Sequence, residues 1–503
     1  MESPSPTLIR ESESLADQVR SAVIWRSGSQ IFAQMVQWGA TFMVIRILAP
    51  ADYGLFAMTQ VVVLLLNMLN GYGLASGLIR QPDVTDRQIR QLFGMMLLVN
   101  LGLATIQLIL APVAAAYYRQ PIVGQMLQVQ ALIYATTPFM ALAYALLSRS
   151  MDFKRQARVN ILSSIASASA ALIGAMAGLG VWTLVIAPLV MFAVRAVGLT
   201  VAARSLMWPI FDFRGAGHLA RYGSVMAIGQ LLWFVESQMD VFIAGRSLNP
   251  HMLGIYTTSL FLTQIFVSKV VPPLNEVAFS AYARMQDDSS AIASAFARSV
   301  RVILTAALPF YVGLAVTAEP IVVTMLGPKW VEAIPIVRIL ACAMPMLTLQ
   351  VLLAPACDAT GHPGISVRNG ATGAVLLGSA YLIGIQWGVI GLACSWLAAY
   401  PLYLVISLGR TLPVIGVSAR ALFASILPPL IAAVAMGVSV MMIDAALPVV
   451  PAPLRLAVLV VVGGGVYVGW LSIFSRAAIT EIIAIVRRQP AAQRAPNPMP
   501  ASA

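Results

Sequence analysis

Long apolar runs alternate with short polar turns along most of the chain. Each run is about 20 residues long, which is the length that an α-helix needs to cross the hydrocarbon core of a bilayer. Fourteen such runs can be placed, the first near Val23–Leu48 and the last near Leu454–Phe474. Because only helices and closed barrels satisfy every backbone polar group inside lipid, the pattern predicts an all-α polytopic membrane protein.

Composition and charge agree with this prediction. Only 10% of the 503 residues are charged and the mean hydropathy is +0.86, whereas a soluble domain carries about 25% charged residues. With the N-terminus inside, 23 of the 31 lysines and arginines fall in cytoplasmic segments, 5 in outside turns and 3 within spans. This asymmetry predicts that both termini are cytoplasmic. It also indicates that the net charge of +12 reflects the orientation of the chain in the membrane and not nucleic-acid binding.

A polar pattern recurs at an interval of 200 residues. The sequence Arg-x-Leu-x-Pro-x-x-x-Gly occurs at the end of the first span and again at the end of the seventh. Since an even number of spans separates the copies, both run in the same direction and predict two lobes related by an axis along the membrane normal. The identical pairs are Gln30/Gln230, Phe42/Phe242, Arg46/Arg246, Leu48/Leu248, Pro50/Pro250 and Gly54/Gly254.

The repeat and the charge pattern together predict the organisation of the chain. The longest cytoplasmic loop is expected at Glu276–Arg301, with an amphipathic stretch on the inner membrane surface. The tail is rich in proline and alanine, and its end is expected to be disordered. The predicted parts are a cytoplasmic N-terminal segment (1–21), two six-helix lobes (22–204 and 221–409), an extra helix pair (420–475) and a cytoplasmic tail (476–503).

Polar side chains form a stripe along the first span. Arg26, Gln30, Gln34 and Gln37 follow one another at steps of four, four and three residues, so they share one face of a helix. The seventh span repeats the arrangement, because its polar residues fall within an arc of about 120°. The members of this second stripe are Gln230, Trp233, Glu236 and Asp240, and Lys269 follows in the eighth span.

Polar stripes in both lobes predict a hydrated cavity between them, since charges within membranes usually mark transport pathways. Other interpretations stay open. The polar residues could join helices by hydrogen bonds, and Arg26 could reach the inner headgroups. Glu236 or Asp240 could form a structural ion pair with Lys269 or Arg26. For Arg195 and Arg338, which also lie within spans, the pattern does not decide between cavity and headgroups.

The sequence contains no arrangement typical of catalysis. Three histidines and three cysteines are scattered along the chain without metal-ligand spacing. We therefore expect neither an enzyme nor a metal site or cofactor. Basic residues in a cavity would suit an anionic cargo, because arginine and lysine hold phosphate or pyrophosphate by charge-assisted hydrogen bonds.

Several motifs, in order along the chain, resemble those of one known family. They are RILAPADYGLFA at Arg46–Ala57, MDVFIAGRSL at Met239–Leu248, VAFSAYARMQDD at Val277–Asp288 and GPKWVEAIPIVRILA at Gly327–Ala341. The chain resembles the polysaccharide transporter, or Wzx-type flippase, branch of the multidrug/oligosaccharidyl-lipid/polysaccharide exporter superfamily. The pattern is most similar to exporters of colanic-acid- or xanthan-type exopolysaccharide.

The resemblance implies a bundle of two six-helix lobes in the bacterial inner membrane. It implies a cargo of undecaprenyl-pyrophosphate-linked oligosaccharide, moved by alternating access for exopolysaccharide or lipopolysaccharide synthesis. The pyrophosphate is then expected on Arg26 and Lys269, the sugars on the glutamine stripe and Trp233, and a coupling proton or cation on Glu236 and Asp240. Expected partners are membrane lipids, the polysaccharide polymerase and a chain-length regulator, with no nucleic acid.

Two rival functions follow from the same pattern. A small-molecule/cation antiporter of this superfamily would need a smaller and more acidic cavity, usually on twelve spans. An enzyme such as the polysaccharide polymerase would be expected to carry a large outside loop with basic catalytic residues, whereas the outside turns here are short.

Overall fold

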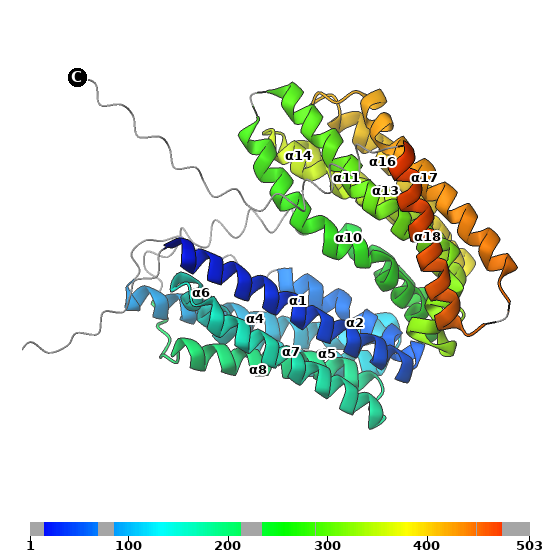
Figure 1. The fold of residues 1–503 in the computed structure, drawn as a ribbon. Helices are drawn as coiled ribbons and strands as arrows, with labels where there is room; N and C mark the ends of the chain where they lie inside the picture. Colours follow the sequence, from blue (N-terminus) through cyan, green and yellow to red (C-terminus); the bar gives the residue numbers. More distant parts are fainter. Residues whose placement is uncertain (1–14, 69–84, 213–233, 287, 449, 475–503) are drawn as a thin grey trace, which may run out of the picture. The chain divides into compact units, whose positions relative to one another are not determined.

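The computed structural model describes residues 15–68, 85–212, 234–286, 288–448 and 450–474 (Figure 1). Helices make up the regular structure of these ranges. In the first half they are α1 (Leu15–Ile47), α2 (Pro50–Met68), α4 (Asp86–Tyr118), α5 (Pro121–Gln130), α6 (Ile133–Arg149), α7 (Phe153–Met176), α8 (Val181–Ala203) and a helix of residues 234–247. In the second half they are α10 (Pro250–Arg284), α11 (Ser289–Val316), α12 (Ala318–Ile321), α13 (Ala333–Val351), α14 (Leu353–Ala359), α15 (Pro363–Gly384), α16 (Gly388–Thr411), α17 (Ala419–Ala446) and α18 (Ala452–Phe474).

The helices confirm the predicted membrane-spanning architecture. Eleven helical runs among the described residues are long and apolar enough to cross a bilayer. One of them, Pro363–Thr411, holds two helices, α15 and α16, which are joined by a 3-10 turn at Ile385–Trp387. With α1 and the helix of residues 234–247, the described helices correspond to the fourteen predicted spans.

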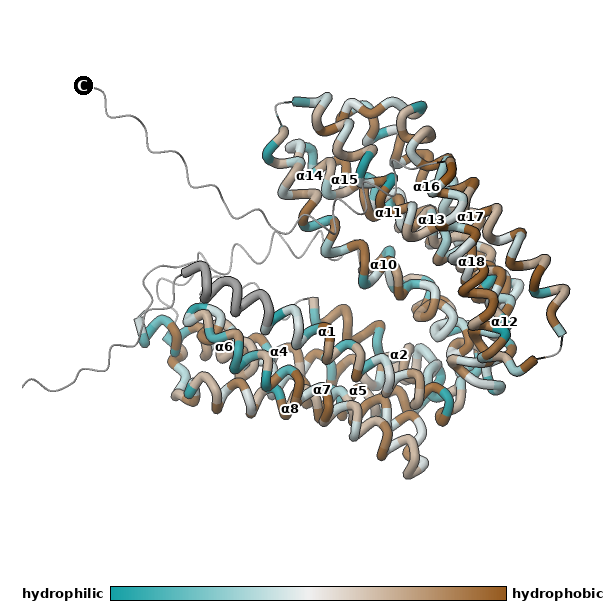
Figure 2. Tube along the Cα trace, viewed as in Figure 1, coloured by the Kyte–Doolittle hydropathy of each residue, from teal (hydrophilic) through white to brown (hydrophobic). Residues whose placement is uncertain are grey.

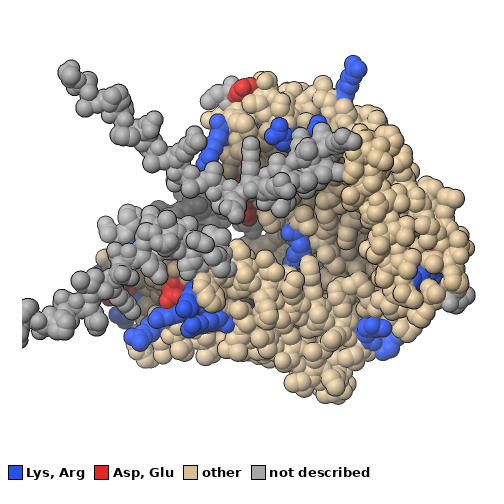
Figure 3. Space-filling view, viewed as in Figure 1, with Lys and Arg blue, Asp and Glu red and all other residues tan. Residues whose placement is uncertain are grey.

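The helix surfaces are those of a protein surrounded by lipid. Apolar residues predominate along the helices, and polar residues gather toward many of their ends (Figure 2). On the face drawn in Figure 3, most of the described surface carries neither basic nor acidic side chains. Large apolar side chains that would be costly in water are exposed along α17, among them Val434, Val438 and Met441.

The chain divides into two compact units. Unit 1 comprises residues 1–257 and 325–330, and unit 2 comprises residues 258–324 and 331–503. The helix of residues 234–247 and the first turns of α10 therefore group with unit 1, although the repeat assigns them to the second lobe. The lobe boundaries read from the repeat, 22–204 and 221–409, stay a prediction.

In unit 1, α1 lies along α7, and α7 packs in turn against α8 (Figure 1). Small residues make this close packing possible, as in other membrane helix pairs. Ala175 of α7 packs against Val44 and Leu48 at the end of α1. Gly198 of α8 leaves room for Val159 of α7, because a Cβ at residue 198 would lie only 2.8 Å from a methyl carbon of Val159.

The two copies of the repeated motif touch each other within unit 1. A Cβ added at Gly54 would lie 2.8 Å from the carbonyl carbon of Pro250 and 2.9 Å from the amide nitrogen of Gly254. The reverse relation also holds, because a Cβ at Gly254 would lie 2.6 Å from the carbonyl carbon of Pro50 and 3.0 Å from the amide nitrogen of Gly54. The start of α2 therefore crosses the start of α10 with backbone against backbone, in a nearly symmetric contact that only glycine permits.

Polar contacts to other segments of unit 1 hold both motif copies. Lys329 Nζ donates to the Ile47 carbonyl at 2.9 Å, and Trp330 Nε1 donates to the Ile45 carbonyl at 3.0 Å, so the last turn of α1 is capped by a distant loop. In the second copy, the Arg246 side chain donates to the Tyr117 carbonyl at the end of α4 and lies over the Tyr117 ring. Each motif copy is thus held by hydrogen bonds to a segment distant in the sequence.

In unit 2, α17 packs along α11, and α13 and α15 pack against α16. The extra pair α17 and α18 is attached by polar contacts at both ends. Arg455 forms two hydrogen bonds with the Asp444 carboxylate, at 2.6 and 2.8 Å, and lies 3.5 Å from Glu319. Tyr467 donates to the Thr305 carbonyl at 2.8 Å. The last two helices are therefore an integrated part of unit 2.

One structural prediction is wrong. The segment Glu276–Arg301 is not a long loop, because α10 continues to Arg284 and α11 begins at Ser289. Asp288 caps α11 by accepting from the amides of Ser290 and Ala291, both at 3.0 Å. The segment was predicted to be a loop because its charged residues lower its hydropathy. Charged residues are nevertheless compatible with a helix that extends beyond the bilayer.

Candidate functional site

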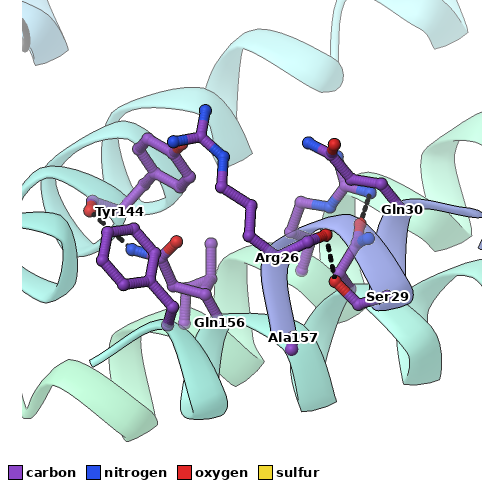
Figure 4. A pocket seen from close by; sticks show the side chains of 10 residues that line it. Arg26, Ser29, Gln30, Tyr144, Gln156 and Ala157 are labelled. Carbon is purple, nitrogen blue, oxygen red and sulfur yellow. Dashed lines mark hydrogen bonds between the residues drawn. The ribbon is translucent and has the colours of Figure 1, made fainter. Parts of the chain in front are cut away.

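A polar pocket of about 200 Å³ lies within unit 1, between α1, α6, α7 and α8. Its polar lining comprises Arg26, Ser29 and Gln30 from α1, Tyr144 from α6, Gln156 and Asn160 from α7, and Arg195 from α8. In the view of Figure 4 the Arg26 side chain lies between Tyr144 on one side and Gln30 on the other. Two of the predicted substrate-binding residues, Arg26 and Gln30, thus line one pocket.

Helix geometry explains which side chains meet here. Arg26 and Gln30 are four residues apart on α1, and Gln156 and Asn160 are four residues apart on α7, so each pair shares one helix face. Because α1 lies along α7, the two polar faces are brought together. Buried Ala157 stands between them and leaves space that a larger side chain would fill.

Hydrogen bonds set the positions of the lining side chains. Arg195 Nη2 donates to Asn160 Oδ1 at 2.8 Å, which holds a guanidinium at the pocket. Gln156 Nε2 donates to the Tyr144 carbonyl at 3.2 Å and to Ser148 Oγ at 2.9 Å. Ser29 Oγ donates to the Arg26 carbonyl at 3.0 Å, so this hydroxyl is bonded within α1. The Arg26 side chain points away from its own helix (Figure 4).

The electrostatic character of the pocket is positive. Two guanidinium groups, Arg26 and Arg195, line it, and its described lining residues include no aspartate or glutamate. Lys154, next to the pocket-lining Phe153, lies 5.7 Å from the centre of the Trp25 ring and adds a further positive charge near the start of α7. Arginine, amide and hydroxyl groups together suit an anion with several acceptor oxygens, such as a phosphate.

The size of the pocket limits what it can enclose. Pockets that bury a drug-sized ligand measure roughly 300–1,000 Å³. A cavity of about 200 Å³ therefore fits one phosphate-sized or monosaccharide-sized group rather than an oligosaccharide. A larger cargo would have to extend beyond the pocket.

The other residues of the first polar stripe are placed differently. Gln34 and Gln37 are half-buried on α1 and do not belong to the pocket lining. The Gln37 Oε1 atom is buried without a hydrogen-bond partner among the described residues. Gln230 and Trp233 lie outside the described residues, so their predicted roles stay untested.

The acidic residues of the helix 234–247 differ in their surroundings. Glu236 is half-buried, whereas Asp240 is only 1% exposed. Asp240 accepts hydrogen bonds from the Tyr256 hydroxyl at 2.6 Å and from the Val241 amide at 2.7 Å. Its carboxylate is therefore part of the packing between this helix and α10, and its predicted coupling role stays a prediction.

The predicted basic residues outside the pocket lie in unit 2. Lys269 is exposed on α10, three residues before the proline pair Pro272 and Pro273. Arg338 is exposed on α13 and acts electrostatically on Asp444 near the end of α17. Arg195 lines the unit 1 pocket, and whether Arg195 and Arg338 face a cavity between the lobes stays open. A cavity formed jointly by both lobes stays a prediction.

Sequence reasoning missed Tyr144, Gln156 and Asn160. A signal was present for the two α7 residues, because Gln156, Asn160, Ser163 and Ser167 follow one another at steps of four, three and four. This is the same periodicity that singled out the first span. Tyr144 stands alone on an apolar helix and carries no such signal.

Comparison with known proteins gives the family. The sequence model described as "Polysaccharide biosynthesis protein" matches residues 43–335, which is more than half of the chain. The chain belongs to this family of polysaccharide biosynthesis proteins. The expected family is thereby confirmed.

Curated relatives of this family member match over most of their lengths. The teichuronic acid biosynthesis protein TuaB of Bacillus subtilis is 23% identical over 73% of this chain and 76% of its own. The succinoglycan biosynthesis transport protein ExoT of Rhizobium meliloti is 26% identical over 70% and 71%, respectively. The lipopolysaccharide biosynthesis protein WzxC of Escherichia coli is 20% identical over 78% and 82%.

Solved structures show the fold. The lipid II flippase MurJ in an inward closed conformation superposes with a TM-score of 0.73 at 12% identity, covering 91% of this chain and all of MurJ. A multidrug resistance MATE family transporter in an inward-facing conformation gives a TM-score of 0.58 at 14% identity, covering 79% of this chain and all of the transporter. This family member thus has the helical fold of multi-pass membrane transport proteins.

Proposed function

We propose that this polysaccharide biosynthesis protein is a flippase for lipid-linked oligosaccharide. Its cargo would be undecaprenyl-pyrophosphate-linked repeat units, which it moves from the inner to the outer leaflet of the bacterial cytoplasmic membrane by alternating access. The products serve exopolysaccharide or lipopolysaccharide synthesis. The observation that supports this proposal most directly is the positive pocket around Arg26 and Arg195, in a chain whose relatives include the succinoglycan biosynthesis transport protein ExoT.

The pocket would hold a phosphate of the pyrophosphate. Arg26 reaches it from α1, and Arg195 is held in place by Asn160. Gln30 and Gln156 would donate amide hydrogens to phosphate or sugar oxygens. By the charge count, the pocket lies toward the cytoplasmic ends of α1, α6 and α7, where an inner-leaflet cargo would first bind.

The remaining predicted residues have roles in this proposal. Lys269 would provide a further basic contact, and Gln34, Gln37, Gln230 and Trp233 would contact sugars. Glu236 and Asp240 would couple transport to a proton or cation. Both termini would be cytoplasmic, and a polysaccharide polymerase and a chain-length regulator would receive the product.

The rival proposal is a small-molecule/cation antiporter of the same superfamily. MATE transporters share the fold, but the superposition with MurJ covers 91% of this chain whereas that with the MATE transporter covers 79%. The described lining of the pocket is basic rather than acidic. Both observations favour a lipid-linked anionic cargo over a drug or a simple cation.

The test uses a strain that lacks the gene and carries plasmid-borne variants. Arg26→Ala should reduce surface polysaccharide to the level of the empty plasmid, with lipid-linked oligosaccharide retained on the inner leaflet. Arg26→Lys should restore part of the export, because the charge remains while the bidentate geometry is lost.

Arg158→Ala is the matched control, since Arg158 is exposed on α7 and does not line the pocket. It should export as the wild type does. Membrane levels of each variant are compared by immunoblot. Full export by Arg26→Ala at normal protein level would refute the proposed anion site, and unchanged polysaccharide with altered drug tolerance in the deletion strain would favour the antiporter.

A further inference from the structure

A second basic groove lies in unit 2, and its lining includes none of the residues discussed above as cargo contacts. It measures about 560 Å³ and runs between the start of α17 and the first half of α11. Arg298 and Arg301 line it from α11, and Ser418 and Ser425 line it from the other side. The described lining residues include no aspartate or glutamate.

The arrangement of these groups suits a phosphate. Arg298 and Arg301 are three residues apart, so their side chains are neighbours on one face of α11. Ser418 is the N-cap of α17, and its hydroxyl accepts from the Ala421 amide at 3.2 Å. The first turn of a 28-residue helix thus faces the groove and adds its positive partial charge to that of the two arginines.

The floor of the groove is made of small side chains. Ala293 and Ala297 lie on α11, and Ala421 and Ala424 lie on α17. Larger residues at these positions would occupy the space that a headgroup needs. Such basic grooves between membrane helices at the cytoplasmic side are typical sites for phospholipid headgroups.

An apolar stripe continues from the groove along α17. Starting at Ala424, it follows steps of three and four residues, so it forms one face of the helix. Its side chains are exposed, from 37% for Leu427 to 59% for Met441, and α17 is a candidate membrane span. The stripe consists of Leu427, Ile431, Val434, Val438 and Met441. A polar, basic end that leads into an exposed apolar face matches the two parts of a lipid molecule.

We propose that this groove binds the phosphate headgroup of an anionic glycerophospholipid, with the acyl chains along the apolar stripe of α17. By the charge count, the bound lipid belongs to the inner leaflet, because Arg298 and Arg301 lie in a predicted cytoplasmic segment. The inference does not depend on the proposed transport of oligosaccharide. The lipid would stabilise the contact between α11 and α17.

The experiment measures binding of fluorescent phosphatidylglycerol to the full-length protein in neutral detergent, with phosphatidylcholine as the uncharged comparison. Phosphatidylglycerol should bind more tightly. The double variant Arg298→Gln/Arg301→Gln should lose about fivefold in affinity for each arginine, because one basic contact near a membrane surface contributes about a factor of five. Arg284→Gln, which removes an exposed charge outside the groove, should bind as the wild type does.

A second variant tests the groove without changing its charge. Ala424→Leu fills the floor while both arginines remain, and it should also weaken phosphatidylglycerol binding. Equal binding of phosphatidylcholine and phosphatidylglycerol would overturn the proposal, and so would wild-type affinity in both groove variants. Displacement of phosphatidylglycerol by undecaprenyl pyrophosphate in the wild type but not in the double variant would reassign the groove to the cargo.

Discussion

The crossing of the two motif copies gives a quantitative prediction for Gly54→Ala. The new Cβ would overlap the carbonyl oxygen of Pro250 and lie 2.8 Å from its carbonyl carbon, whereas carbon atoms in contact prefer about 3.5–4.0 Å. The start of α2 must therefore move away from the start of α10 by at least about 1 Å, because backbone atoms on both sides cannot change rotamer. Overpacking of this kind costs about 1–3 kcal/mol.

Gly39→Ala is the matched control on α1. A Cβ at Gly39 meets no atom within 4 Å, so alanine there should be neutral or stabilising by up to about 1 kcal/mol through helix propensity. Gly254→Ala should behave like Gly54→Ala, since its Cβ would lie 2.6 Å from the carbonyl carbon of Pro50. Once one alanine has separated the helices, the second should cost less, so the double variant should be less destabilised than the sum of the singles.

The assay is thermal unfolding of the purified variants in one detergent, followed by the fraction that remains monodisperse after heating. Gly54→Ala and Gly254→Ala should unfold at lower temperatures than Gly39→Ala. Equal midpoints for all three variants would refute the close crossing of the two motifs. Strict additivity in the double variant would show that the two glycines do not share one contact.

Two further predictions concern polar contacts between helices. Tyr256→Phe should destabilise the protein by about 1.5–3 kcal/mol, because the buried Asp240 carboxylate loses the hydroxyl that donates to it. Adding Asp240→Asn to this variant should restore part of the lost stability. A thermal midpoint of Tyr256→Phe equal to that of the wild type would contradict the contact. Arg455→Ala should lower the free energy of unfolding by no more than about 1 kcal/mol, because the Arg455–Asp444 pair is partly exposed and screened by salt. A larger loss of stability that persists at high salt would show that the pair holds α18 in place by more than charge.

The pattern of apolar runs was sufficient to predict the helices and their order. The 200-residue repeat was used only to predict two lobes of the same orientation. The structure shows in addition that its two copies touch, with Gly54 against Gly254. Periodicity could not predict which face packs against which. Asp240 shares a helix face with Glu236 in the sequence pattern, yet it is buried against Tyr256 because α10 covers that position.

Only the α1 wall of the pocket consists of residues whose polar pattern was singled out in the sequence. Arg26 and Gln30 were found because a polar stripe on an apolar span is conspicuous, although the cavity expected for them lay between the lobes. Gln156 and Asn160 follow a run of basic residues and were not singled out. The end of α10 was misjudged for a related reason. Hydropathy reports where a helix leaves the bilayer, whereas the cap at Asp288 shows where the turn between the two helices ends.

The central claim is that this protein transfers lipid-linked oligosaccharide between leaflets, and one measurement tests it most directly. The purified protein is reconstituted into vesicles that contain undecaprenyl-pyrophosphate-linked oligosaccharide, and an impermeant glycosidase reports which leaflet holds the sugar. We expect the protected fraction to fall in vesicles with the wild type and to persist with Arg26→Ala. A protected fraction that stays constant with the wild type, in vesicles where the protein is folded and both orientations are present, would contradict the account.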